Sequence, residues 1–249
     1  MIGKVAKYNV YMAIKSKMML IESIILIGVA LYTFYISIGN TLSRSGGFGN
    51  AFKMLQLRIT FQTMGIMIPL AIIGFFAEFV FQEFLANEKM KGRFEFLIAN
   101  GIPLKDLWMG TSLGISAMSV FILFVIYPLV LFLVYIFTKS SFYNSYFLIL
   151  WFVIFPLLAI AVSFLISILG FIIKRVKLFE GVLMGFVLLL FFSGSFIMNH
   201  ILLKESKTGN IVTPALIRIF LVVILGTMVL TFFLKKRLTV DNVTLSIPD

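Results

Sequence analysis

The chain contains no cysteine and a single histidine among its 249 residues. Without thiols it can form neither disulfides nor Cys-ligated metal sites, and one histidine without an HExxH motif cannot complete a zinc ligand set. The G-x-x-x-x-G-K-[ST] loop that cradles nucleotide phosphates is also missing from the sequence. We therefore predict that this chain itself binds no metal and no cofactor.

Charged residues are scarce as well, at 12% of the chain against about a quarter in soluble domains. A hydrophobic content of 61% and a mean hydropathy of +1.11 exclude a water-soluble fold. Only helices satisfy their own backbone hydrogen bonds in lipid, and about 20 apolar residues suffice to cross it. We predict one all-α polytopic membrane domain over 1–249, with about six transmembrane helices at 18–38, 59–82, 107–137, 146–173, 178–199 and 214–234.

Lys and Arg outnumber Asp and Glu by 21 to 10, but they lie between the apolar runs rather than in one patch, so nucleic acid is not predicted as a partner. Fourteen of the 21 precede the first run, follow the sixth, or lie between the second and third or the fourth and fifth. Because cytoplasmic loops of membrane proteins are enriched in Lys and Arg, we predict that both termini, including a short tail at 238–249, are cytoplasmic.

The amino-terminal stretch 1–17 has the pattern of an amphipathic helix. Drawn at 100° per residue, it places three lysines and a tyrosine within one arc, opposite small and apolar residues: Lys4, Lys7, Tyr11 and Lys15 against Ile2, Ala6 and Ala13. This pattern favours a helix on the inner surface of the bilayer, with Lys4, Lys7 and Lys15 toward anionic headgroups. A solvated tail is the alternative.

Three acids fall inside the apolar runs, each close to the cytoplasmic end: Glu22, Glu78 and Glu180. Arg58 and Arg218 lie equally close to the outer ends of their runs. Charges at these depths are explained by snorkelling and boundary anchoring. Proton- or ion-coupled carriers usually hold charged or broken-helix sites at the midplane. A secondary transporter is therefore the disfavoured alternative.

An intramembrane protease is a further alternative, because Ser193, Ser195 and His200 lie close together in the sequence near the outer end of the fifth run. A nucleophilic Ser and its His must be hydrogen-bonded. Positions five residues apart diverge by about 140° around a helix, so Ser195 and His200 would meet only at a helix break. Small polar residues at helix contacts explain the same pattern.

Two Gly-x-x-x-Gly motifs, Gly110–Gly114 and Gly181–Gly185, predict places where helix backbones approach closely. Prolines lie inside three of the apolar runs, at Pro69, Pro128 and Pro156, and predict kinks there.

The segment 84–106 concentrates charge in a chain that otherwise avoids it. Apolar residues recur at helical spacing on one side and charged residues on another: Met90, Phe94, Leu97 and Ile98 against Glu88, Lys91 and Glu95. Asn100 and Gly101 predict a helix C-cap, and Pro103 suits the first turn of the next helix. We predict a cytoplasmic helical elbow with an apolar and a charged face, rather than a solvated loop.

Here the chain resembles the permease subunits of ATP-binding-cassette exporters of the second type, the ABC-two family. Members carry a Glu, a basic residue followed by Gly, a second Glu and a Leu after the second span, and a Gly entering the third. The matching residues are Glu88, Lys91, Gly92, Glu95, Leu97 and Gly110. Arg93, the displaced Pro103 and Thr111 depart from the family pattern.

The resemblance implies a subunit of a prokaryotic cell-membrane exporter, in which two permease chains pair as a homodimer or heterodimer. Each chain would dock a separate cytoplasmic ABC ATPase, which holds ATP and Mg, through its elbow. The implied coupling residues are Glu88, Lys91, Gly92, Arg93, Glu95, Leu97, Gly101 and Pro103. In similar permeases two short re-entrant helices precede the last span, which would place them at 192–213 here. The transported substrate is not indicated.

Overall fold

The computed structural model of the chain describes residues 2–15, 21, 24–25, 28–29, 31–32, 35–36, 39–40, 50–80, 85, 87–138, 145–173 and 214–240. Every element in these ranges is a helix, which confirms the predicted all-α class for the described part of the chain. The fifth predicted span, the second Gly-x-x-x-Gly motif, Glu22, Glu180 and the predicted re-entrant segment lie outside the described residues, as do Ser193, Ser195 and His200.

Four of the described helical segments are long and apolar enough to cross a membrane. They lie in α3 (Asn50–Val80), α6 (Leu104–Thr138), the joined helix of α7 (Ser145–Ile149), η2 (Leu150–Ile154) and α8 (Phe155–Ile172), and α10 (Pro214–Lys235). These correspond to four of the six predicted spans and confirm the transmembrane character of the chain. The predicted span 18–38 is described only at isolated positions.

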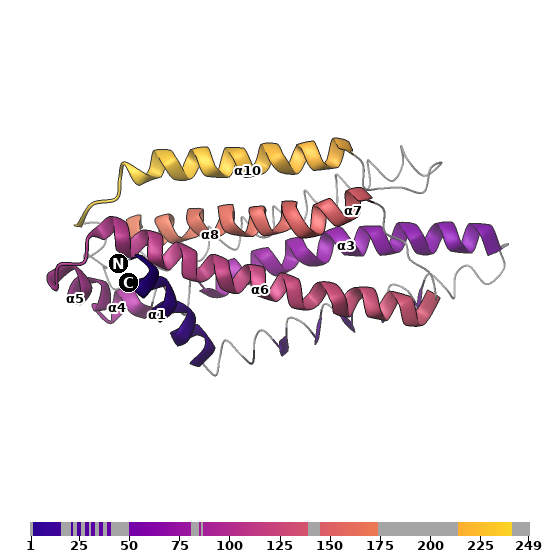
Figure 1. Cartoon of the computed structure of the whole chain (residues 1–249), viewed down its shortest axis with the longest axis horizontal. Coiled ribbons are helices and arrows are strands. Elements are labelled where there is room, and N and C mark those ends of the chain that lie inside the picture. The colour runs from indigo at the N-terminus through magenta and orange to yellow at the C-terminus, as the bar shows by residue number, and fades with distance from the viewer. Residues whose placement is uncertain are drawn as a thin grey trace.

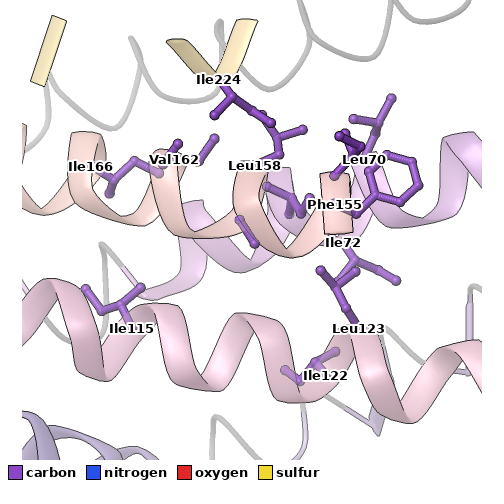
Figure 2. Close-up of a cluster of buried hydrophobic side chains, with 14 of the residues drawn as sticks. Leu70, Ile72, Ile115, Ile122, Leu123, Phe155, Leu158, Val162, Ile166 and Ile224 are labelled. Carbon is purple, nitrogen blue, oxygen red and sulfur yellow. The ribbon is translucent and has the colours of Figure 1, made fainter. Parts of the chain in front are cut away.

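Helix α8 lies at the centre of the described bundle, beside α6, α3 and α10 (Figure 1). Thirteen of its 18 residues are buried, whereas α10 buries only Leu216, Ile224 and Thr231. Figure 2 shows the apolar core between these helices, with Phe155, Leu158 and Val162 of α8 close to residues of three neighbouring helices. Because lipid tails are as apolar as these side chains, the close van der Waals packing of this core, rather than removal of apolar surface from water, is what favours association of the helices in a bilayer.

A π-helical turn, η2, joins α7 to α8 just before Pro156. The backbone N–H of Phe155 donates to the carbonyl of Leu150, five residues back instead of four. Proline has no N–H to continue the α-helical ladder, and a π-turn is one way in which helices accommodate such a site. The other two prolines, Pro69 and Pro128, lie inside α3 and α6, which continue as single helices past them.

Several helix termini meet at one end of the bundle, the left end in Figure 1. Here α1 (Ile2–Lys15), α4 (Asn87–Met90) and α5 (Arg93–Ala99) lie beside the start of α6 and the ends of α8 and α10. The side chain of Lys235 at the end of α10 lies 5.9 Å from the ring centre of Trp108 in α6. This end of the bundle carries the segments that the sequence singles out.

Candidate functional site

The elbow consists of two short helices, not one continuous amphipathic helix. Gly92 separates α4 from α5 with a positive φ of 65°, a left-handed conformation that glycine adopts at no steric cost. The predicted helical spacing therefore holds within α5, for Phe94, Leu97 and Ile98, but not across the turn at Lys91 and Gly92, which changes the register. A glycine within a short polar segment was the signal for this break.

The predicted C-cap of the elbow is confirmed. Gly101 follows Asn100 with φ of 79°, and its N–H donates to the carbonyl of Ile98 at 2.9 Å. The N–H of Ile102 donates to the carbonyl of Leu97 at 3.1 Å, which completes a Schellman motif. Pro103 lies just before α6, and its carbonyl accepts the first hydrogen bond of that helix, from Asp106 at 2.9 Å. These turns fix the direction of α5 relative to α6.

One face of the elbow packs against the bundle, as the apolar spacing predicts. Phe94 is 5% exposed, and its ring centre lies 4.8 Å from that of Phe171, near the end of α8. Leu97 and Ile98 are partly buried and pack against the same core. The side chain of Met90, the fourth predicted member of this face, lies outside the described residues.

Lys89 also points into the bundle, which sequence reasoning missed. Its side chain is 4% exposed, and Nζ donates to the carbonyls of Ile173 at 2.8 Å, Phe171 at 3.3 Å and Gly170 at 3.4 Å. The last carbonyls of a helix have no partner within the helix, and they carry its negative dipole end. Lys89 thus caps α8 from a segment about 80 residues away in the chain. A cap from so far away leaves no local signal in the sequence.

The opposite face of the elbow is open. Lys91, Glu95 and Asn100 are exposed there, as is Phe96, whose exposed fraction of 66% is high for a phenylalanine. The predicted coupling residues therefore divide: Lys91, Glu95, Gly101 and Pro103 are exposed, while Gly92 and Leu97 are half-buried. Phe96 was not among the predicted site residues, and an exposed phenylalanine has no distinctive pattern in the sequence.

Glu88 and Arg93 pair across the turn, with Arg93 Nη1 2.9 Å from a Glu88 carboxylate oxygen. Burial raises the pKa of the Glu88 carboxyl above its ordinary value, and the charge of Lys91 partly opposes this shift. The Arg93 guanidinium also lies 4.7 Å from the ring centre of Tyr8 in α1, a cation-π contact. Arg93 therefore connects α4, α5 and the first helix.

Helix α1 is confirmed over 2–15, with Lys4, Lys7 and Tyr11 exposed together as predicted. The side chain of Lys15 lies outside the described residues, although Lys15 ends the helix. The buried face rests on α6: Val5 and Asn9 are both buried, and Asn9 Nδ2 donates to Thr111 Oγ1 at 3.2 Å.

Helix α1 packs on the first Gly-x-x-x-Gly motif, Gly110–Gly114. A Cβ at Gly110 would lie 2.5 Å from Val5 Cβ and 2.9 Å from the backbone oxygen of Ile2, and one at Gly114 would lie 2.9 Å from Asn9 Cβ. The predicted close approach of helix backbones at Gly110 and Gly114 is thus confirmed, and its partner is the amino-terminal helix of the same chain.

A groove of about 300 Å³ separates α1 from the elbow. Its lining is mainly apolar, with Lys4, Glu88 and Arg93 as its charged members, and it includes Phe94, Phe96, Leu97, Ile102 and Leu107. The hydroxyl of Tyr8, which also lines the groove, is buried without a hydrogen-bond partner. The arrangement can accept a mixed apolar and polar surface from another molecule.

Inside the bundle, the buried hydroxyl groups of α6 are satisfied by their own helix. Thr111, Ser112, Ser116 and Ser119 each donate to the carbonyl four residues back, at 2.7 to 3.0 Å. Among the described residues, no group of three His, Cys, Asp or Glu side chains lies close enough to hold a metal ion. The side chain of Glu78 is not among those described, whereas Arg218 in α10 is exposed.

No protein-family model, no curated protein and no solved structure matches this chain.

Proposed function

We propose that this chain is the membrane-spanning subunit of an ABC exporter of the second type, which lines half of a translocation path and docks a separate ATPase. The observation that carries the proposal is the two-sided elbow. Its inner face, with Lys89 and Phe94, is attached to the end of α8, while its outer face presents Glu95 and Phe96 to the surroundings. A loop that merely connected two spans would need neither a capped helix nor an exposed phenylalanine.

The proposal includes six spans, with both termini in the cytoplasm of a prokaryotic cell. It is supported by most of the described basic residues, which lie at the end of the bundle where α1, α4, α5 and the last turn of α10 are found: Lys4, Lys7, Lys89, Lys91, Arg93, Lys105, Lys235, Lys236 and Arg237. Lys53 and Arg58, in the first turns of α3, and Arg218, near the start of α10, lie outside this group. Reporter fusions or cysteine accessibility at positions 2, 95, 142, 176, 207 and 245 should report inside, inside, outside, inside, outside and inside. An extracellular carboxyl terminus would refute this topology.

The ATP and Mg sites belong, in this proposal, to the partner ATPase. The chain carries no phosphate-binding loop, so the purified chain alone should hydrolyse no ATP. From native membranes it should co-purify with a cytoplasmic ATPase and a second permease chain, identical or different. Specific hydrolysis by this chain, free of other subunits, would contradict the proposal.

The docking role of the outer face is tested by shortening its side chains. Because aromatic anchors at interfaces carry about 2 kcal/mol or more, Phe96→Ala should weaken retention of the ATPase roughly 30-fold. Glu95→Ala should cost less than about 1 kcal/mol if its partner is exposed, and about 2 to 5 kcal/mol if the pair is buried. The double variant Glu88→Ala with Glu95→Ala should insert normally and lose retention. Binding is measured on chain purified in detergent.

The matched control is Phe132→Ala, another phenylalanine with a highly exposed side chain but near the end of α6 that is far from the elbow. It should retain the ATPase fully. Membrane levels of the variants at exposed positions should stay near wild type, because such changes usually alter stability by less than about half a kcal/mol. For the double variant, which also removes the partner of Arg93, membrane level is measured beside retention. If Phe96→Ala and the double variant hold the ATPase as tightly as wild type does, the elbow is not the docking site.

A further inference from the structure

Lys89 is a charged side chain in a place where charge is costly. Burying an ammonium group is unfavourable unless hydrogen bonds replace its water. Here the carbonyls of Gly170, Phe171 and Ile173 supply that replacement, at 3.4, 3.3 and 2.8 Å. Two of these oxygens belong to the last turn of α8 and the third to its C-cap residue Ile173, at the end where the helix dipole also favours a cation. The contact is therefore a specific tie between α4 and α8.

A second contact joins the same two parts of the molecule. Phe94, on α5, packs its ring against Phe171, whose carbonyl is one of the Lys89 acceptors. Gly92 lies between Lys89 and Phe94 in the chain, and its left-handed conformation turns α5 so that both side chains reach the end of α8. The elbow thus meets α8 through one polar and one apolar contact at adjacent residues.

We infer that Lys89 is a positioning residue that makes the elbow and α8 move as one body, so that a push on the outer face of the elbow reaches the core. Helix α8 is suited to receive such a push, because it packs against α3, α6 and α10. This inference rests on the proposed function for the origin of the push. The tie itself is a property of this chain alone and can be tested without the ATPase.

The chain offers a matched control for Lys89. Lys91 has the same side chain two residues away but is exposed, so Lys91→Met removes the same charge without touching α8. Lys89→Met keeps an unbranched side chain of similar length while removing all three hydrogen bonds. Lys89→Arg restores a cation and donors, and should rescue what Lys89→Met loses.

The test measures two distances between spin labels by electron paramagnetic resonance. Labels are attached at introduced cysteines, which is straightforward because the chain has no cysteine of its own. One pair links the elbow to α8, with labels at Ala99→Cys and Leu157→Cys. The other pair links α6 to α8, with labels at Leu113→Cys and Leu157→Cys. Leu113 and Leu157 are both exposed, so their labels do not displace the core. The full chain is placed in lipid nanodiscs.

In the Lys89→Met variant, the elbow-to-α8 distance distribution should broaden and shift by a few Å, while the α6-to-α8 distribution stays as in wild type. Lys91→Met and Lys89→Arg should both resemble wild type. An unchanged elbow-to-α8 distribution in Lys89→Met would overturn the inference. A change in both distributions would overturn it too, because Lys89 would then support the whole bundle rather than the elbow.

The link to transport is tested on the complex that co-purifies from native membranes. With ATP, Mg and vanadate added, the distance between labels at Leu157→Cys in α8 and Val222→Cys in α10, a helix that is not joined to the elbow, should change in wild type. This change should be lost in Lys89→Met although the ATPase stays bound. The same change in Lys89→Met as in wild type would refute transmission through Lys89. If no ATPase co-purifies with wild type, the proposed function fails, while the nanodisc distances still decide whether Lys89 ties the elbow to α8.

Discussion

The two faces of the elbow use the same residue types in opposite surroundings. Lys89 is buried against α8 and Lys91 is exposed, and Phe94 is 5% exposed whereas Phe96, two residues along the same short helix, is 66% exposed. The side chains of the buried pair, Lys89 and Phe94, make their contacts within the chain. The exposed pair, Lys91 and Phe96, contributes little to the fold. A role for these two side chains is therefore expected in contacts with another molecule.

The largest expected effect separates the two phenylalanines. Phe94→Ala should lower the free energy of unfolding by about 3 to 5 kcal/mol, because it removes a buried ring and leaves a cavity beside Phe171. Phe96→Ala should change it by less than about half a kcal/mol. Both are measured by thermal unfolding in one detergent. Equal losses from the two substitutions would mean that the outer ring is as much a part of the fold as the inner one.

The next largest effect is expected from a comparison of two glycines, Gly110, which packs against α1, and Gly226, which has open space beside it. Gly110→Ala places a Cβ 2.5 Å from Val5 Cβ and against the backbone of Ile2, so α1 has to shift, at about 1 to 3 kcal/mol. Gly226→Ala, in α10, meets nothing within 4 Å and should be neutral or gain up to about 1 kcal/mol of helix propensity. Unfolding temperatures report both changes. A neutral Gly110→Ala would show that α1 does not need this close contact.

The smallest expected effect concerns the pKa of Glu88, which lies between the buried and the exposed face of the elbow. Because burial raises the pKa of Glu88 in the folded state, the unfolded chain releases that proton at a lower pH than the folded chain does. The contribution of Glu88 to stability is therefore present below about pH 4.3, the ordinary value for Glu, and is lost as the pH rises through the raised folded pKa.

Glu88→Gln, which carries no titrating group, should accordingly gain stability relative to wild type as the pH rises over that interval. Unfolding temperatures of the two proteins at a series of pH values from about 4 to 8 measure this difference. Glu95→Gln, on the exposed face, controls for the loss of one negative charge. A difference that moves in favour of wild type with rising pH would mean that the ion pair with Arg93 outweighs burial.

Sequence patterns predicted the parts of this structure that depend on local chemistry. Apolar length placed α6 within three residues of its observed start, and the pair Asn100 and Gly101 predicted a real C-cap. The start of α3 was predicted nine residues too late, because its first turns contain polar residues that a hydropathy run excludes.

Features that depend on distant residues were not predicted. The spacing of Gly110 and Gly114 indicated a close contact but not that α1 would fill it, since any helix can pack on small residues. Lys89 was counted as a charge that orients the chain, whereas its ammonium caps a helix far along the sequence. The docking role of the elbow residues stays a prediction, since it depends on a molecule outside this chain.

The π-turn before Pro156 determines which neighbouring helices the side chains before and after it face. An extra residue in a turn rotates everything beyond it by about 100° relative to an uninterrupted α-helix. Upstream of the turn, Phe147 faces Gly65 of α3, where a Cβ would lie 2.5 Å from its ring. Deleting one residue from Leu150–Ile154 should restore an uninterrupted α-helix and rotate Phe147 away from that glycine. The extra residue thus sets the rotation of α7 relative to α8 about the helix axis. Insertions and deletions in this helix would change that rotation.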